Sequence, residues 1–327
     1  MYLKNSKIIV IKIGSSLLVD NKKKIRKKWL SSFANDLRKL KSKNKKIIIV
    51  SSGAIALGCK KMNIEKKNLK LDKSQAIASV GQIELMNLFS QTFSKFKLNI
   101  SQILLTLDDT EERRRSINAK RTFENLFDLD YIPIVNENDT IATSEIKYGD
   151  NDRLASRVAQ ITNADTLILL SDVDGLFTKN PKIFKDAKLI KKVNDLDKDI
   201  KNINIKGITE FGKGGMITKI EAAKICNLAG CNMIIANGLY LNPINQIEKK
   251  NNQEIMSNLL NTKDLYISDW SCPYSVENNR FYFNQRCKGC QILYRLRKGN
   301  SEKLDEIEIY NGSKKGNKLI LQKFQFF

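Results

Sequence analysis

Two patterns of apolar residues alternate along the chain. Short continuous apolar runs are typical of buried strands, and apolar residues that recur every three or four positions are typical of helices. Several runs end in a turn of small residues that opens a helical pattern, as at 51–54. This repetition predicts an α/β fold in which helices cover both faces of a mainly parallel sheet. The expected strands are 7–13, 46–50, 102–105, 132–135, 166–170 and 232–236.

A helical pattern also covers residues 110–127, where Arg113, Arg114 and Arg115 follow one another. It predicts one continuous helix. A run of charged residues on a helix usually marks a surface that contacts solvent or another subunit. We favour that interpretation over a phosphate site.

Polar side chains gather on both sides of one predicted strand-to-helix connection. Residues 136–139 (Asn-Glu-Asn-Asp) follow the apolar run at 132–135, and residues 149–152 (Gly-Asp-Asn-Asp) precede a helical pattern. A single cluster of this kind is best explained by turns and caps, for which Asn and Asp are well suited. Two clusters that frame one connection favour a binding site, because ligands of α/β folds lie beyond the carboxyl ends of strands.

Two other segments carry residues suited to bind phosphate. Lys12 precedes the turn at 14–16 (Gly-Ser-Ser), which can offer backbone N–H groups and one cation, although such turns are more often structural. Residues 211–219 hold three glycines and two lysines immediately before an alanine-rich helix. Glycines at a helix start allow a nest of backbone amides, so phosphate binding is favoured there over a plain hinge. The spacing of a Walker A loop is absent.

Composition narrows the chemistry further. The chain of 327 residues contains no His, which excludes imidazole general bases, Ser-His-Asp or Cys-His nucleophiles and His metal sites. The net charge of +22 comes mostly from lysines scattered over every polar face, so it is a weak argument for nucleic acid binding. No apolar run is long enough to span a bilayer and no signal segment opens the chain, so we expect a cytoplasmic protein with no membrane partner.

Six motifs, taken together, resemble the amino-acid kinase family, and within it the branch that phosphorylates glutamate. The combination of NEND and GDND distinguishes this branch from the acetylglutamate and aspartate kinases. One residue departs from the family pattern, because Lys213 stands where a small hydroxyl residue is usual. The motifs are IKIGSS at 11–16, SSGAIALG at 51–58, NEND at 136–139, KYGDNDRLA at 147–155, LLSDVDGLF at 169–177 and GKGGMITK at 212–219.

The resemblance implies a three-layer α/β/α sandwich around a mainly parallel, eight-stranded sheet. It also implies a kinase that uses ATP to convert L-glutamate to L-glutamyl 5-phosphate and ADP, the first step of proline biosynthesis. Lys12 and Lys219 would neutralise the transferring phosphoryl group, and Asp152 would hold both lysines in place.

The resemblance assigns the substrates to the remaining motif residues. Ser52, Asp139 and Asn151 would bind glutamate, with Asn136 and Asp150 nearby. Mg²⁺ would accompany ATP on phosphate oxygens and waters, so no protein metal site is expected. Relatives are commonly homo-oligomers, either dimers or tetramers. The residues implied for ATP are Lys12, Ser171, Asp172, Lys213, Gly214, Gly215, Met216, Ile217, Thr218 and Lys219.

The pattern changes after residue 252. Short strand-like runs separated by polar turns predict a small β-rich domain at 253–327, after a kinase domain at 1–252. In position and size this domain resembles a divergent or truncated PUA module, an RNA-associated β-barrel, but no motif secures RNA contact. Cys272, Cys287 and Cys290 fall one ligand short of a closed zinc site, so reduced thiols are expected. The runs are 265–267, 281–283, 291–294, 306–310 and 319–324.

Two alternatives remain at the level of the sequence. One is another carboxylate or carbamate kinase of the same fold, which differs in the acid it phosphorylates. The other is an RNA-binding protein with a vestigial kinase body. A vestigial body should have lost Lys12, Asp152 or Lys219, and the sequence retains all three.

Overall fold

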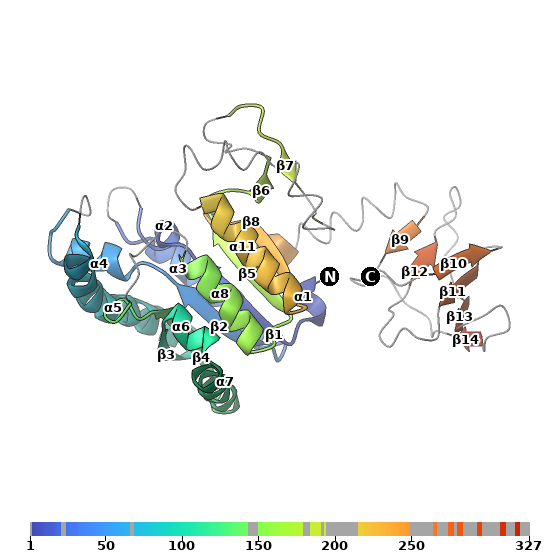
Figure 1. The fold of residues 1–327 in the computed structure, drawn as a ribbon, viewed down its shortest axis with the longest axis horizontal. Coiled ribbons are helices and arrows are strands. Elements are labelled where there is room, and N and C mark those ends of the chain that lie inside the picture. Colours follow the sequence, from blue (N-terminus) through green and yellow to red (C-terminus); the bar gives the residue numbers. More distant parts are fainter. Residues whose placement is uncertain are drawn as a thin grey trace. The chain divides into compact units, whose positions relative to one another are not determined.

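The computed structural model describes residues 2–20, 24–65, 69–142, 150–178, 184–190, 193 and 215–248, together with six short strands between residues 264 and 320 (Figure 1). The chain divides into two compact units, Met1–Glu248 and Lys249–Phe327. The boundary expected at residue 252 stays a prediction, because it lies outside the described residues.

A six-stranded sheet forms the centre of the first unit. Its order is β3-β4-β2-β1-β5-β8, and every neighbouring pair is parallel. The prediction of a mainly parallel sheet is therefore confirmed, while a sheet of eight strands stays a prediction. The strands are β1 (Ile8–Ile13), β2 (Lys46–Ser51), β3 (Asn99–Leu105), β4 (Tyr131–Glu137), β5 (Thr166–Ser171) and β8 (Asn232–Asn237).

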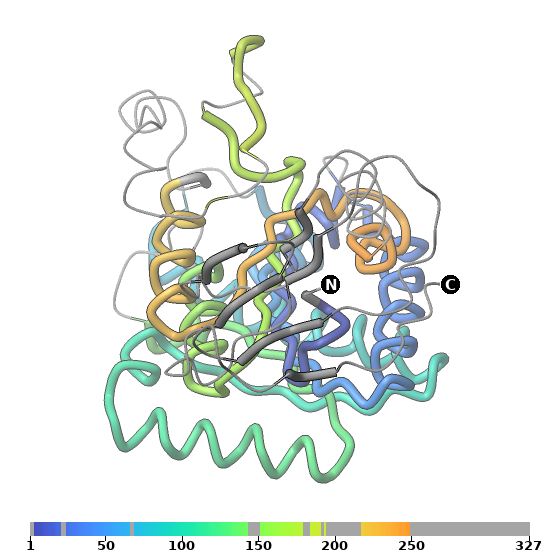
Figure 2. Tube along the Cα trace, turned by 90° about the vertical axis from the view of Figure 1, so that its right-hand side faces the viewer, coloured from blue at the N-terminus to red at the C-terminus, as the bar shows by residue number. Residues whose placement is uncertain are grey.

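Helices cover both faces of this sheet. Side chains of β1 alternate between two apolar clusters: Ile9 and Ile11 pack with α3 and α5, and Val10 packs with α8 and α11. Burial on both faces explains why the strands read as continuous apolar runs. Figure 2 shows α3 and α11 on opposite sides of the sheet. The helices are α1 (Tyr2–Asn5), α2 (Ser15–Leu18), α3 (Lys27–Lys41), α4 (Ala54–Lys61), α5 (Leu71–Phe93), η1 (Ser94–Phe96), α6 (Leu107–Glu111), α7 (Arg113–Asp128), α8 (Asp150–Ile161) and α11 (Gly215–Leu228).

The prediction of one continuous helix over 110–127 is wrong near its start. The segment contains two helices, because α6 ends at Glu111 and α7 begins at Arg113. Glu112 between them has the extended angles φ −72° and ψ 120°. Its side chain accepts a hydrogen bond from the backbone N–H of Arg114 and so caps α7. The break follows from this local capping, which apolar spacing does not reveal.

Two glycines bring α4 and α5 unusually close together. A Cβ on Gly81 of α5 would lie 1.7 Å from the carbonyl oxygen of Ala54, and one on Gly58 of α4 would lie 2.1 Å from that of Ile77. No larger residue fits either position without a shift of backbone. Since α4 begins directly after the turn that follows β2, this contact holds the middle of α5 beside the end of that strand.

Outside the six-stranded sheet, β6 (Leu176–Phe177) and β7 (Leu189–Ile190) form a small antiparallel pair. The second unit contains a four-stranded sheet, β10-β11-β13-β14, and the antiparallel pair β12-β9. Five of its strands overlap the expected runs, and β10 was not expected. The PUA-like assignment stays a prediction, and the three cysteines of this region lie outside the described residues. These strands are β9 (Asp264–Tyr266), β10 (Tyr274–Glu277), β11 (Arg280–Phe283), β12 (Leu293–Arg295), β13 (Glu308–Asn311) and β14 (Lys318–Ile320).

Within the described part of the chain, no helix has both the length and the apolar character needed to cross a membrane.

Candidate active site

The carboxyl ends of the parallel strands place the predicted site residues along one edge of the sheet. Ile13 of β1 pairs with Ser51 of β2, and Lys12 pairs with Leu169 of β5, so these three strands end nearly level. Open parallel sheets bind their ligands beyond this edge. The predicted site residues that follow these strands therefore start from the same edge of the sheet.

The most buried charges at this edge form a triad of Lys12, Asp152 and Lys219. Lys12 Nζ lies 2.6 Å from Asp152 Oδ1, and Lys219 Nζ donates to Asp152 Oδ2 at 3.0 Å. The carboxylate side chain is 1% exposed and the two lysine side chains are 12% and 10% exposed. The three residues come from β1, α8 and α11, so the fold joins positions that are far apart in the sequence.

The triad holds two positive charges and one negative charge. Burial acts to raise the pKa of Asp152, but the charges of Lys12 and Lys219 outweigh it and hold that pKa below its usual value. Asp152 is therefore ionised at neutral pH, and it orients both ammonium groups. A buried group with a net positive charge is suited to receive an anion.

The hydroxyl of Thr218 adds a contact that the sequence did not reveal. Its Oγ1 lies 3.3 Å from Asp152 Oδ2. Thr218 was expected only among the ATP residues. In the structure it also contacts the carboxylate that holds the two lysines.

A row of side-chain amides lies beside the triad. Asn136, at the end of β4, donates from Nδ2 to Oε1 of Gln82 on α5 at 2.8 Å. Asn151, the neighbour of Asp152 in α8, donates from Nδ2 to Oδ1 of Asn136 at 3.5 Å. Gln82 belongs to this row, although the sequence analysis did not select it. In the sequence, Gln82 is marked only as a polar residue next to Gly81 within a helical pattern of apolar residues.

Two further predicted substrate residues lie near the strand ends. Ser52 follows β2, and its hydroxyl donates to the carbonyl oxygen of Ile13 at 3.3 Å. Asp139 lies just beyond β4, and burial raises its pKa to about 6. The described residues supply no cation to Asp139. A half-buried carboxylate in that situation is suited to receive a positively charged group from a ligand.

The predicted ATP residues are only partly described. Ser171 ends β5, its backbone carbonyl accepts from the N–H of Gly238 at 2.7 Å, and its hydroxyl lies 3.4 Å from Asp172 Oδ1. Ile217 is half-buried against the small cluster around Leu176. Lys213 and Gly214 lie outside the described residues, and so do the side chains of Asp150 and Met216. Gly215 is the first residue of α11.

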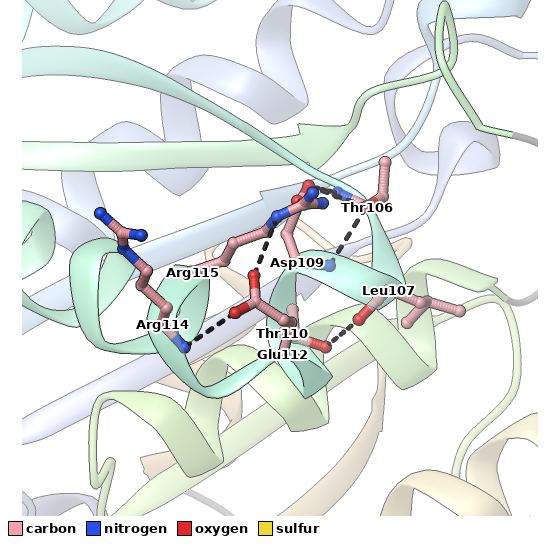
Figure 3. A network of polar contacts seen from close by, with 7 residues as sticks. All are labelled: Thr106, Leu107, Asp109, Thr110, Glu112, Arg114 and Arg115. Atoms are coloured by element: carbon pink, nitrogen blue, oxygen red, sulfur yellow. Dashed lines mark hydrogen bonds and ion pairs between the residues drawn. The ribbon is translucent and has the colours of Figure 1, made fainter.

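A second polar network lies at the junction of α6 and α7 (Figure 3). Thr106 and Asp109 form a capping box at the start of α6, and Arg115 contacts both Asp109 and Glu112. Arg113, Arg114 and Arg115 are all exposed. The expectation that this arginine run forms a surface is confirmed, since its contacts here serve the helix ends.

Comparison with known proteins gives a consistent result along most of the chain. Residues 7–237 match the model of the amino acid kinase family. The chain is 73% identical over 251 residues to the glutamate 5-kinase of Pelagibacter ubique, and 51% identical over 240 residues to that of Agrobacterium fabrum. These matches cover 77% and 73% of this chain, and 68% and 62% of the two relatives. The matched part thus spans about two thirds of the length of these curated relatives.

Solved structures show the same fold at low sequence identity. The carbamate kinase of Giardia lamblia bound to AMP-PNP has a TM-score of 0.53 at 17% identity, covering 76% of this chain and 97% of its own. The UMP kinase of Bacillus anthracis has a TM-score of 0.50 at 18% identity, covering 74% of this chain and 91% of its own. At such identities the likeness concerns architecture alone.

Proposed function

The chain belongs to the amino acid kinase family, and we propose that it transfers the γ-phosphoryl group of ATP to the side-chain carboxylate of L-glutamate. The observation that carries this proposal is the buried triad of Lys12, Asp152 and Lys219 at the carboxyl edge of the sheet. Two cations held by one carboxylate suit a reaction in which negative charge moves between two anionic partners.

The proposed reaction needs no general base. A glutamate side chain has a pKa of about 4.3 and is already ionised at neutral pH. One of its carboxylate oxygens attacks the γ-phosphorus, the bond from that phosphorus to the β,γ-bridging oxygen breaks, and ADP leaves without any proton transfer. The absence of His from the sequence therefore does not prevent this reaction.

The barrier lies in the approach of one anion to another. Lys12 and Lys219 offset this repulsion, and they do so most strongly when charge is shared between the donor and acceptor oxygens. Asp152 contributes indirectly, because it fixes where the two ammonium groups point. Catalysis by position and charge is the usual strategy in phosphoryl transfer.

The substrate side of the site follows the polar residues beyond β2 and β4. We assign Ser52, Asp139 and Asn151 to glutamate, with Asn136 and Asp150 beside them. The half-buried carboxylate of Asp139 suits the ammonium group, and the amides suit either charged end of the amino acid.

ATP would lie along β5 and the start of α11. Lys12, Ser171, Asp172 and the segment 213–219 are the residues proposed to hold it. Mg²⁺ supplies additional neutralisation of the phosphates when bound, and it needs few protein carboxylates for that role.

The proposed homo-oligomer and the proposed RNA contact do not depend on this site. The homo-oligomer is supported by the edge of the sheet. β3 is the last strand on one side of the described sheet, and its residue Leu104 is 38% exposed. A second copy of the chain could cover this open edge.

A coupled assay of ADP release tests the proposal. The unaltered chain is incubated with ATP, Mg²⁺ and, in turn, glutamate, acetylglutamate, aspartate or carbamate. Glutamate-dependent release well above the other three is expected. Faster release with another acid would retain the kinase and replace its substrate, and release with none would refute the kinase itself.

A further inference from the structure

The hydrogen bonds along the amide row all run in one direction, from Asn151 to Asn136 and from Asn136 to Gln82. A carboxamide offers an acceptor oxygen on one side and donor N–H groups on the other. Asn136 gives its donor to Gln82 at 2.8 Å, so its oxygen faces Asn151, which donates to it at 3.5 Å. Each link therefore fixes the orientation of the next amide.

Both ends of the row are buried polar atoms that have no hydrogen-bond partner among the described residues. One end is the donor Nε2 of Gln82, and the other is the acceptor Oδ1 of Asn151. Buried polar groups are nearly always hydrogen-bonded, and leaving one unpaired is costly. A free donor at one end and a free acceptor at the other match a ligand that has both an anionic and a cationic group.

The fold holds Gln82 firmly in this position. Its neighbour Gly81 makes the closest approach between α5 and α4, next to the backbone of Ala54. Two turns earlier on the same helix, Gln75 Nε2 donates to the carbonyl oxygen of Ala142 at 2.9 Å. α5 thus holds both ends of the segment that carries Asp139, so Gln82 cannot turn away without disturbing that segment.

We propose that Gln82 is a further residue of the amino-acid site, where its Oε1 orients Asn136 and Asn151 and its Nε2 donates to the α-carboxylate of the substrate. This inference rests on the proposed function. The side-chain carboxylate of the substrate must face Lys12 and Lys219, so the α-carboxylate has to lie elsewhere. Gln82 is third in a row that starts beside Asp152, and its free donor suits that carboxylate.

The test compares two substitutions at this position. Gln82→Glu keeps an acceptor for Asn136 but replaces the donor with a negative charge that repels a carboxylate. Gln82→Met keeps the length of the side chain and removes both functions. Gln91→Met is the matched control, because Gln91 lies on the same helix and is exposed. The KM for glutamate, the KM for ATP, kcat and the melting temperature are measured for each.

We expect Gln82→Met to raise the KM for glutamate by about tenfold, since a site built to hydrogen-bond its substrate responds strongly to the loss of a partner. Gln82→Glu should raise it further. The KM for ATP should stay within about twofold in both variants, and Gln91→Met should match the unaltered chain.

Two results would overturn the proposal. The first is a KM for glutamate in Gln82→Glu that equals the unaltered value, which would show that Nε2 touches no carboxylate. The second is an equal rise in both KM values in Gln82→Met with a lowered melting temperature, which would show a purely structural role. If the unaltered chain uses another amino acid, the proposed function fails, and the same comparison with that substrate still decides the role of Gln82.

Discussion

The first unit contains two polar networks built from the same kinds of residues, one buried and one on the surface. In the buried triad, Asp152 is 1% exposed between two lysines. In the surface network, Arg115 is 61% exposed between Asp109 and Glu112. Exposed ion pairs contribute at most about 1 kcal/mol, because water and salt screen them. Loss of one partner from a buried pair costs about 3–5 kcal/mol, because a charge is left in a poorly solvated place.

The two networks also differ in what their charges accomplish. Around Asp109, burial acts to raise the pKa, but hydrogen bonds from Thr106 and the charge of Arg115 lower it. Each contact there closes a helix end, which the fold requires. The described contacts of the triad instead join β1, α8 and α11, and its net charge is suited to a ligand. Burial, and not residue type, therefore separates a site from a surface support.

The largest expected effect is the loss of a triad lysine. Lys12→Ala and Lys219→Ala should each lower kcat by about 100-fold or more, since each removes charge that acts chiefly in the transition state. Lys43→Ala is the control, because Lys43 is 54% exposed and pairs with Glu248 on the surface. Steady-state kinetics and melting curves are recorded together. Near-normal turnover in a folded lysine variant would contradict the assignment of the phosphoryl site.

The same substitution in both networks sharpens the comparison. Asp152→Asn leaves two buried ammonium groups without their carboxylate and should lower the free energy of unfolding by about 3 kcal/mol or more. Asp109→Asn should lower it by about 1 kcal/mol. Urea unfolding at neutral pH measures both. Equal losses would show that burial does not distinguish the networks.

The pH dependence of these two variants has a defined sign. The folded state lowers the pKa of both Asp152 and Asp109, so each carboxylate contributes stability above its unfolded pKa of 3.8 and loses it as the pH falls through the folded value. The stability gap between the unaltered chain and either variant should therefore shrink in acid.

A smaller effect is expected at Asp139, where burial raises the pKa to about 6. A bound ammonium group favours the ionised form, so the KM for glutamate should fall as the pH rises through about 6. Asp139→Asn should raise this KM and flatten its pH profile. A profile as steep in the variant as in the unaltered chain would assign the titration to another group.

Asp139 should have the opposite effect on stability. With the folded pKa raised, its contribution is present below 3.8 and is lost as the pH rises through about 6. Without glutamate, Asp139→Asn should therefore be the more stable protein above that pH. Thermal unfolding across this pH range shows whether the gap opens.

The smallest effect is expected on the surface. Thr106→Ala removes the cap of α6 and should cost about 1 kcal/mol of stability with kcat and both KM values unchanged. Thr122→Ala is its control, since Thr122 is an exposed hydroxyl within α7 that donates to the carbonyl oxygen of Asn118. A loss of turnover in Thr106→Ala would connect the surface network to catalysis.

Much of the sheet could be predicted from the sequence because buried parallel strands are continuously apolar. The strand expected at 46–50 is β2, Lys46–Ser51. The strand expected at 102–105 begins earlier, at Asn99. β3 is the last strand of the described sheet, and its polar residues, such as Asn99 and Ser101, interrupt the apolar run from which strands are predicted.

The site could be predicted only where motifs mark it. The geometry brings together Lys12, Asp152 and Lys219, which the family resemblance named. Gln82 was missed because its contact with Asn136 depends on the close packing of α4 and α5 at Gly81, which is a tertiary feature. The two residues are 54 positions apart, and no local pattern connects them.

The most direct test of the central claim is to trap the product with hydroxylamine. An acyl phosphate formed on the glutamate side chain reacts with hydroxylamine to give a hydroxamate, which is measured by colour and mass. The unaltered chain should form this hydroxamate in step with ADP, and Lys219→Ala should form almost none under the same conditions. ADP release without hydroxamate, or an equal yield from Lys219→Ala, would contradict the claim that the buried triad transfers phosphate to glutamate.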